Sequence, residues 1–479
     1  MSENKKNWIK LIALALALLI PCFGIIAICG FLPSVYYHTF LGELSPKFDR
    51  LNAVDSPKVV VVGGSSVAFG LDSALLSENV GLPVVNFGLY ATLGTKIMLD
   101  LSKSNIGEGD IVVLAPEMDA QTLSLYFNAE AAWQGLDGEM GMLRYIGRDD
   151  WSDMAGGLWN FVAAKTKYTF EGALNPAGVY NRDSFNEYGD IAYARPYNTM
   201  LLGYDPTKII DLKGDLFDEA FIDYVNDYVV WCEKQGAKVY FSFCPMNKES
   251  ISATTTEDSL IAFYRFLDEK FSCDVISNVN DYIIDADYFY DSNFHLNDAG
   301  VVVRTAQLAR DINRARGIST QVKIDIPDAP ERPASDTTVA ETDALLASYY
   351  TYAEYGTGWM ITGVTDAGKA LASLDLPASY EGKPVLAINT GAFEGCDKLT
   401  KLTIEKHIVQ LMDGAFSGAN ALAKIYIHND DADSIGVGDR LFDGAASGVK
   451  LVLTTQTSYE SFIANYFWGK YGAWMTLEK

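Results

Sequence analysis

Short apolar runs alternate with longer amphipathic stretches between residues 57 and 318. The apolar runs predict strands at 58–62, 82–85, 110–114, 238–243 and 274–279, with helices at 71–78, 95–102 and 298–314. Apolar strands separated by helices indicate a parallel sheet that is covered on both faces. The fold class is therefore α/β, and functional residues are expected at the carboxyl ends of the strands.

This alternation stops between residues 151 and 204. The segment is rich in aromatic and polar residues, among them Trp159, Tyr180 and Tyr188, and it has little strand signal. An insertion of this length in an α/β domain is either a lid or binding loop, or a local helical packing unit. The sequence favours neither, although exposed aromatic residues in a lid would suit sugar stacking.

The first 33 residues form a different class of segment. Lys5, Lys6 and Lys10 precede and open an apolar run at residues 8–32 that has no acidic residue. A run of this length predicts a transmembrane helix with its basic flank in the cytoplasm, and a cleaved signal peptide is the alternative. We expect a single-pass cell-membrane protein with the bulk of the chain extracytoplasmic, and residues 34–56 form a juxtamembrane segment.

A proline-rich acidic stretch at 319–343 predicts a linker, and a repeat follows in residues 344–479. The motif Ala392-Phe393-x-Gly395 recurs as Ala415-Phe416-x-Gly418, offset by 23 residues, and Phe442-Asp443-Gly444 is a degraded last copy. This period predicts a leucine-rich solenoid. The region resembles the BspA-like leucine-rich repeats of bacterial surface proteins.

Composition excludes some function classes. The net charge of −25 and the lack of a basic run argue against nucleic acid as a partner. Cys232, Cys244, Cys273 and Cys396 have no metal-ligand spacing and are too few for a disulfide scaffold, so we expect buried free thiols. We expect no metal and no cofactor.

A serine follows the first predicted strand in a glycine-flanked turn, Gly63-Gly64-Ser65-Ser66. Such a turn presents the hydroxyl of Ser65 at the end of the strand and places backbone N–H groups near it. Gly-Gly-Ser-Ser also fits a phosphate-binding turn, but the dinucleotide fingerprint and the P-loop lysine are missing.

The candidate base is found by elimination. His295 is the one histidine in the α/β domain, since His38 lies near the apolar run and His407 and His428 lie in the repeats. It follows the last predicted strand and is preceded by Asp291, whose carboxylate would fix the tautomer of the imidazole.

Together these segments resemble the SGNH (GDSL-like) hydrolase family over residues 59–313. The matching blocks are Gly63-x-Ser65, Asn86-Phe87-Gly88, and Asp291 with His295. The resemblance implies a flavodoxin-like three-layer α/β/α fold, an acyl-Ser65 intermediate, and oxyanion binding by the backbone N–H groups of Gly88 and of the turn at Gly64, Ser65 and Ser66.

The sequence departs from the family pattern at two places. Glu117, in Leu114-Ala115-Pro116-Glu117, stands where the family has an asparagine that donates to the oxyanion. An ionised carboxylate there would oppose the developing negative charge, and loss of one donor typically costs about 10²–10³ in rate. The spacing from Asp291 to His295 is also one residue longer than usual.

The expected function is that of an extracytoplasmic serine esterase or O-acyltransferase that acts on acyl groups of cell-envelope polysaccharide. The resemblance implies an acyl ester or envelope glycan as substrate and a membrane-bound O-acyltransferase as partner. The alternative is a surface adhesion or scaffold protein with a catalytically degenerate SGNH domain and partner-binding repeats.

Overall fold

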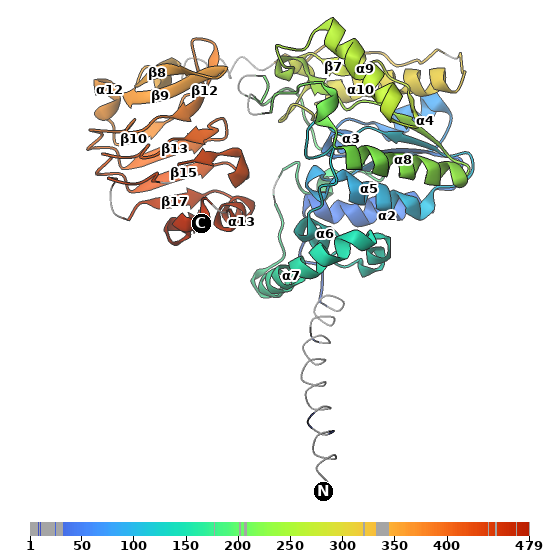
Figure 1. Ribbon diagram of the computed structural model, residues 1–479, viewed down its shortest axis with the longest axis horizontal. Helices are drawn as coiled ribbons and strands as arrows, with labels where there is room; N and C mark the ends of the chain where they lie inside the picture. The colour runs from blue at the N-terminus through green and yellow to red at the C-terminus, as the bar shows by residue number, and fades with distance from the viewer. Residues whose placement is uncertain are drawn as a thin grey trace. The chain divides into compact units, whose positions relative to one another are not determined.

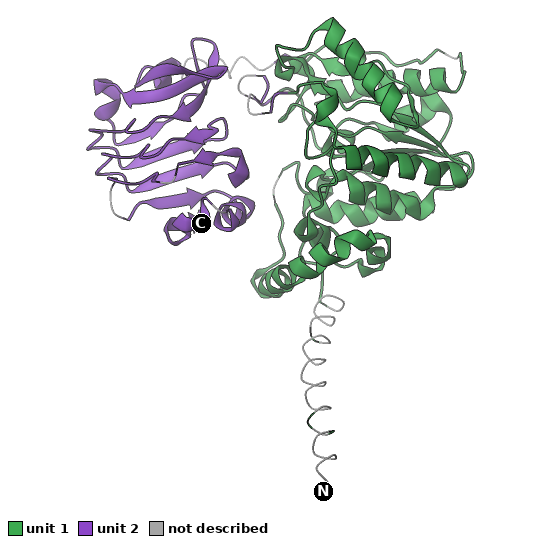
Figure 2. Ribbon diagram, in the orientation of Figure 1, with its two compact units in different colours: residues 1–198, 210–330 green, residues 199–209, 331–479 purple. Residues whose placement is uncertain are grey.

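The computed structural model describes Trp8, Lys10, Gly24 and residues 32–478, with gaps at 177, 201–202, 206–207, 320, 332–343, 439, 446–447 and 466. The chain divides into two compact units (Figure 2). Unit 1 comprises Met1–Asn198 and Ile210–Pro330, and unit 2 comprises Thr199–Ile209 and Glu331–Lys479.

Unit 1 is built on a five-stranded parallel sheet with the order β2-β1-β3-β4-β6. The strands are β1 (Val59–Gly63), β2 (Val84–Gly88), β3 (Ile111–Leu114), β4 (Lys238–Phe241) and β6 (Asp274–Val275). β1 pairs with both β2 and β3, with Val59 opposite Val84 and Ile111. This is the flavodoxin-like order that the sequence resemblance implies, and β1 lies at its topological switch point.

Helices cover both faces of this sheet (Figure 1). Side chains alternate along a strand, so Val59 and Val61 pack on one face and Val60 and Val62 on the other. The first face carries α4 (Ser73–Val80) and α10 (Asp298–Ala315). The second carries α2 (Leu44–Ala53), α5 (Thr95–Ser102), α8 (Glu219–Lys234) and α9 (Glu257–Lys270). Two-residue strands β5 (Met246–Asn247) and β7 (Ile283–Ile284) pair separately.

Residues 34–56, expected as a juxtamembrane segment, are part of the unit 1 core. Leu44 and Leu51 of α2 are buried in its main hydrophobic cluster. Arg50 donates a hydrogen bond of 3.1 Å to the carbonyl of Val84 on edge strand β2. α2 therefore packs beside the edge of the sheet, in the same layer as α5.

The segment at 151–204 begins with a helical packing unit, one of the two structures that the sequence left open, whereas its role as a lid or binding loop stays a prediction. Its first part is α7 (Trp151–Glu171), which packs on α6 (Ala129–Gly135) through stacked Trp133 and Phe161 rings 5.4 Å apart. A buried ion pair of 2.5 Å between Lys165 and Asp137 joins the same elements. The described residues of the second part form no long helix or strand, and this part brings Tyr180 to the end of the sheet.

The N-terminal membrane anchor is the part of the predicted fold that the structure corrects. Among the residues that the structure describes, we find no helix with the length and apolar character needed to cross a bilayer. A span needs about 20 consecutive apolar residues, whereas the longest described helix, α7, carries Asp153, Lys165 and Lys167 within its 21 residues. The predicted span at 8–32 itself lies almost wholly outside the described residues. The anchor, the membrane contact and the single-pass localisation are therefore not retained.

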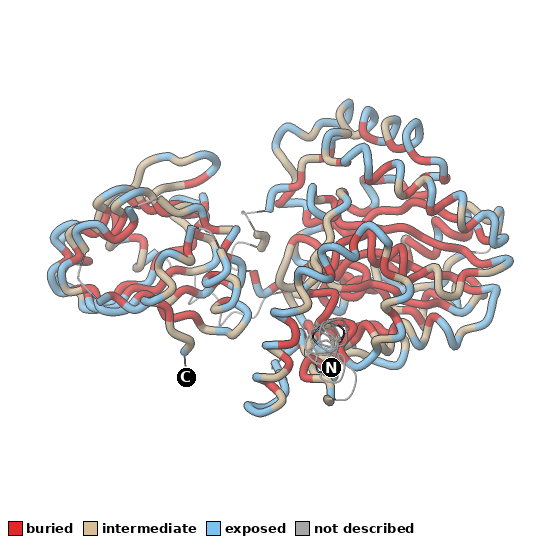
Figure 3. Tube along the Cα trace, turned by 60° about the horizontal axis from the view of Figure 1, so that its bottom comes forward, coloured by how far each residue is buried: buried red, intermediate tan, exposed pale blue. Residues whose placement is uncertain are grey.

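Unit 2 is a solenoid of two parallel sheets with a hydrophobic core between them (Figure 3). One sheet contains β10 (Ser373–Asp375), β13 (Lys401–Glu405), β15 (Lys424–His428), β17 (Lys450–Leu453) and β18 (Met475–Leu477). The other contains β9 (Gly358–Val364), β12 (Lys383–Ile388), β14 (Gln410–Leu411) and β16 (Gly436–Val437), with β8 (Tyr350–Tyr355) antiparallel at its edge and β11 (Ser379–Tyr380) beside β12. Short helices α12 (Asp366–Lys369) and α13 (Gln456–Ala464) complete the unit.

The strand register follows the sequence repeat. Lys401 pairs with Lys424 and Ala387 with Gln410, each across the predicted offset of 23 residues. The repeated phenylalanines form a stack inside the solenoid, with ring centroids 5.6 Å apart for Phe393 and Phe416 and 5.2 Å apart for Phe416 and Phe442. Phe442 thus occupies the position of a third copy.

We predict that Phe416→Ala destabilises unit 2 by about 3–5 kcal/mol, because it leaves a cavity between two rings of this stack. Urea unfolding of the full chain, followed by tryptophan fluorescence, measures the change. Phe467→Ala is the matched control, since its ring is half exposed in the same unit. Equal losses for the two variants would contradict the packing role of the phenylalanine stack.

Candidate active site

The turn after β1 places Ser65 at the end of the sheet. β1 ends at Gly63, Gly64 is extended, and Ser65 begins the short helix α3 (Ser65–Ala68). A Cβ atom on Gly63 would lie 2.5 Å from the carbonyl oxygen of Ala115, and one on Gly64 would lie 2.7 Å from Oε1 of Glu117. Only glycine fits at position 63, because the backbone after β3 approaches this closely, whereas a side chain at position 64 would have to displace the carboxyl group of Glu117.

A tight turn before α10 brings Asp291 and His295 together. The backbone N–H of Tyr290 donates to the carbonyl of His295 (2.9 Å), and Ser292 Oγ accepts from the His295 N–H (3.1 Å). α10 then begins with Asn297 as its cap, whose side chain accepts from the N–H of Gly300. The turn accommodates the longer Asp–His spacing that the sequence shows.

Ser65, His295 and Asp291 form a continuous hydrogen-bonded chain. Ser65 Oγ lies 2.8 Å from Nε2 of His295, and Nδ1 of His295 lies 2.8 Å from Oδ1 of Asp291. A proton on Nδ1 that is donated to Asp291 leaves Nε2 free to accept the proton of Ser65. This arrangement can activate a serine for attack on an acyl carbon.

Two aromatic residues hold the histidine in place. The Phe69 ring stacks on the imidazole with centroids 3.9 Å apart and planes 4° apart. Tyr180 donates from its hydroxyl to Oδ2 of Asp291 at 2.7 Å. Burial and then the Asp291 charge raise the pKa of Tyr180 well above its usual value, so the phenol stays a donor.

Glu117 lies against the nucleophile. Its Oε1 is 3.1 Å from Ser65 Oγ and accepts a hydrogen bond of 2.7 Å from the N–H of Ser66. The side chain is buried, and burial, followed by the charge of Asp119, raises the pKa of Glu117. The hydrogen bond from Ser66 and the charge of His295 oppose this shift.

Two of the predicted oxyanion donors already have partners inside the protein. The N–H of Gly88 donates to Oδ1 of Asn86 at 2.9 Å, and the N–H of Ser66 donates to Glu117. Each would have to exchange its partner to bind an oxyanion. The N–H of Ser65, at the first position of α3, has no helical partner because the first turn of a helix leaves its N–H groups unpaired.

A buried polar network behind β2 was not predicted from the sequence. Asn86 donates to Asp190 at 2.8 Å, and Lys47 donates to Oδ1 of Asn86 at 3.3 Å and to the carbonyl of Gly189 at 2.5 Å. Burial lowers the pKa of Lys47 to about 8 and raises that of Asp190. The available signal was Lys47 itself, which lies between Leu44 and Leu51 on the apolar face of α2.

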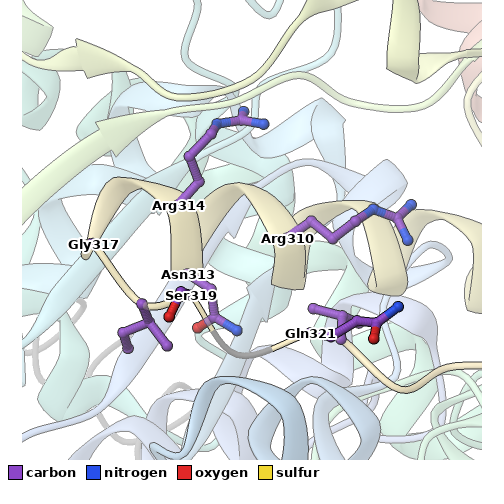
Figure 4. Close-up of a pocket in the computed structure, with 8 residues that line it drawn as sticks. Arg310, Asn313, Arg314, Gly317, Ser319 and Gln321 are labelled. Carbon is purple, nitrogen blue, oxygen red and sulfur yellow. The ribbon is translucent and has the colours of Figure 1, made fainter.

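The other candidate features lie elsewhere. His428 pairs with Glu405 in unit 2 at 2.9 Å. Within the described part of the chain, no group of three or more His, Cys, Asp or Glu side chains is placed to hold a metal ion. A pocket at the carboxyl end of α10 (Figure 4) is lined by Arg310, Asn313, Arg314, Gly317, Ile318, Ser319, Gln321 and Val322. Its lining includes none of Ser65, His295 and Asp291. His295 and Asp291 precede the amino end of α10, whereas the pocket lies at its carboxyl end.

Comparison with known proteins adds little. No family model matches the chain, and no curated protein matches it. A solved leucine-rich-repeat protein from T. pallidum is similar at 18% sequence identity and a TM-score of 0.16, over 26% of this chain and 71% of that chain. A TM-score this low carries no argument, so both family resemblances stay predictions.

The buried carboxyl group of Glu43, beside Lys47, should make the stability of the fold depend on pH. Burial raises its pKa to about 7, so between its ordinary pKa of 4.5 and about 7 the folded state binds a proton that the unfolded state has lost. The free energy of unfolding should therefore fall as pH rises through this range. Urea unfolding at pH 4.5–7 should show a smaller fall for Glu43→Gln than for the wild type. The exposed control Glu78→Gln should retain the wild-type slope, and equal slopes for all three chains would contradict the assignment.

Proposed function

We propose that unit 1 is a serine esterase or O-acyltransferase that acts on O-acyl groups of a polysaccharide through an acyl-Ser65 intermediate. The observation that carries the proposal is the chain from Ser65 through His295 to Asp291, with both links at 2.8 Å. Its three members come from segments 230 residues apart in sequence, and they meet at the carboxyl end of β1, where parallel sheets carry their chemistry.

The reaction follows from this geometry. Nε2 of His295 takes the proton of Ser65 as Oγ attacks the acyl carbon, and Asp291 stabilises the imidazolium that forms. His295 then returns the proton to the departing alcohol oxygen, which leaves the acyl group on Ser65. A water molecule or a sugar hydroxyl, deprotonated by His295, attacks the acyl-serine in turn and releases Ser65.

A small pocket lies beside the end of β2. Its lining combines apolar residues such as Phe40, Leu89 and Leu93 with Glu43 and Lys47, and it includes none of Ser65, His295 and Asp291. The pocket therefore does not specify the length of the acyl group.

Aromatic residues of the 151–204 segment support a sugar as the alcohol part of the substrate. Trp151 and Trp159 are exposed, whereas Tyr180 is 38% exposed and its hydroxyl is hydrogen-bonded to Asp291; exposed rings are the surfaces on which sugars stack. Tyr180 also contacts Asp291, so at least one of these rings lies at the proposed active site.

We predict that the full chain reacts with a fluorophosphonate probe and hydrolyses p-nitrophenyl acetate, and that Ser65→Ala abolishes both. Labelling on a gel and nitrophenolate release measure the two activities. The control is Ser77→Ala, which removes from α4 a hydroxyl that donates to the carbonyl of Leu82. This variant should retain both activities. Labelling that persists in Ser65→Ala would contradict the role of Ser65 as nucleophile. A wild-type chain that does not react at all would contradict the proposed enzymatic function.

A column of lysines on unit 2 supports a second candidate function, the binding of an anionic polymer. Lys401, Lys424 and Lys450 are exposed and directly opposite one another on β13, β15 and β17. Neighbouring strands are about 4.8 Å apart, and like charges in this position destabilise a sheet. None of the three belongs to a salt bridge among the described residues of unit 2. The Tyr426 ring lies 4.7 Å from Lys401 Nζ and adds a stacking surface.

We predict that the full chain binds an acidic polysaccharide such as polygalacturonate, and that replacing these three lysines with alanine weakens binding at least tenfold. Affinity electrophoresis at several salt concentrations measures this. The control replaces exposed Lys383, Lys398 and Lys406 instead, with the same change in net charge. Equal losses in both triple variants would contradict a defined binding column.

A further inference from the structure

The hydroxyl of Ser65 lies within hydrogen-bonding distance of two groups that can each accept its proton, His295 and Glu117. Oγ lies 2.8 Å from Nε2 of His295 and 3.1 Å from Oε1 of Glu117, yet the hydroxyl has a single proton to donate. If that proton goes to His295, the contact with Glu117 is a hydrogen bond only when Glu117 supplies a proton. If it goes to Glu117, His295 must supply one from Nε2.

These alternatives define two states of the site. In the first, Glu117 is neutral and donates to Ser65 Oγ, and Ser65 donates to neutral His295. In the second, Glu117 is ionised, Ser65 donates to it, and His295 is protonated. The two states hold the same number of protons, and only the first has a base that can accept the serine proton. A rise in pH removes a proton from the site and leaves Glu117 ionised beside a neutral His295, with no proton on Glu117 to donate to an oxyanion. Oε1 accepts from the N–H of Ser66 in both states.

We propose that the neutral carboxyl group of Glu117 is the oxyanion donor of this site, and that its ionisation switches the site off. This inference rests on the proposed function. As Oγ bonds to the acyl carbon, the O–H of Glu117 turns from Oγ to the adjacent carbonyl oxygen, which becomes the oxyanion. The proton stays on Glu117 throughout, so the only proton transferred is that from Ser65 to His295.

The surroundings of Glu117 favour its neutral form. Its charged and titratable neighbours are His295, Asp119 and Cys244. Burial raises the pKa of the Cys244 thiol, so this neighbour adds no charge at neutral pH. Arg304, the nearest guanidinium to Cys244, donates to the carbonyl of Gly70. Among the salt bridges of the described residues, we find none that includes Glu117.

The N–H of Ser66 strengthens Glu117 as a donor. A hydroxyl oxygen that accepts a hydrogen bond polarises its own O–H, so the chain from Ser66 to Glu117 to the oxyanion is cooperative. The same contact fixes the carboxyl group beside Oγ, where the Cβ of any residue other than glycine at position 64 would meet it. Glu117 thus replaces the Ser66 amide, whose N–H it occupies, as the group that faces the oxyanion.

The test compares Glu117→Gln with Glu117→Ala in the full chain. Glutamine keeps a neutral donor of the same length at every pH, whereas alanine removes the donor. We expect the wild-type kcat/KM for p-nitrophenyl acetate, and its rate of fluorophosphonate labelling, to fall at high pH. Glu117→Gln should lack this fall and stay within about tenfold of the wild-type maximum. Glu117→Ala should lose about 10²–10³ at all pH values.

An infrared measurement gives a readout that does not depend on activity. The difference spectrum between the wild type and Glu117→Gln should contain the carbonyl band of a buried, protonated carboxylic acid, because the bands of Glu43 and Asp190 are common to both chains and cancel. This difference band should be lost over the same pH range as activity. A Glu117→Gln profile with the wild-type fall, or Glu117→Ala as active as Glu117→Gln, would overturn the role of Glu117. If the wild type is never labelled, it is the serine-hydrolase function that fails.

Discussion

The close approach of three strand ends is the constraint on which the rest of unit 1 depends. Gly63, Gly64 and Gly88 each lie where an added Cβ would come within 2.7 Å of a neighbouring atom. The chain after β3 can therefore press against the turn after β1, and α3 can press against the end of β2. Without this approach, Glu117 would not reach Ser65.

The sheet could be predicted from the sequence because its signal is local. The valine run of β1 is buried on both faces, and only a central parallel strand requires this. The helix predicted at 95–102 is α5, with the same bounds. By contrast, the strand predicted at 274–279 pairs over two residues only. Ser277 leaves the sheet because its hydroxyl bonds Ser242 and Asp311, and such partners are a property of the tertiary fold.

The site shows the same division. His295 was identifiable because the α/β domain has one histidine, and Ser65 because a glycine turn follows a buried strand. The hydrogen-bond partners of the Gly88 and Ser66 N–H groups could not be predicted, because a sequence shows which groups are present but not which of them pair. Lys47 was missed for a related reason: residues 34–56 were assigned to a juxtamembrane segment outside the α/β domain, so the place of Lys47 on an apolar helical face was not weighed. The structure puts that segment in the core.

Glu117 changes how the departure from the family pattern should be understood. An asparagine donor is neutral at every pH, so a site that has one cannot be switched at this position. A carboxyl group donates only while it holds its proton, and burial without a paired cation is the environment that keeps it protonated. The low polarity that makes an ionised Glu117 costly is also what makes a neutral Glu117 an effective donor. Under the proposed function, the residue at which the sequence departs from the SGNH pattern is therefore a donor whose activity depends on pH.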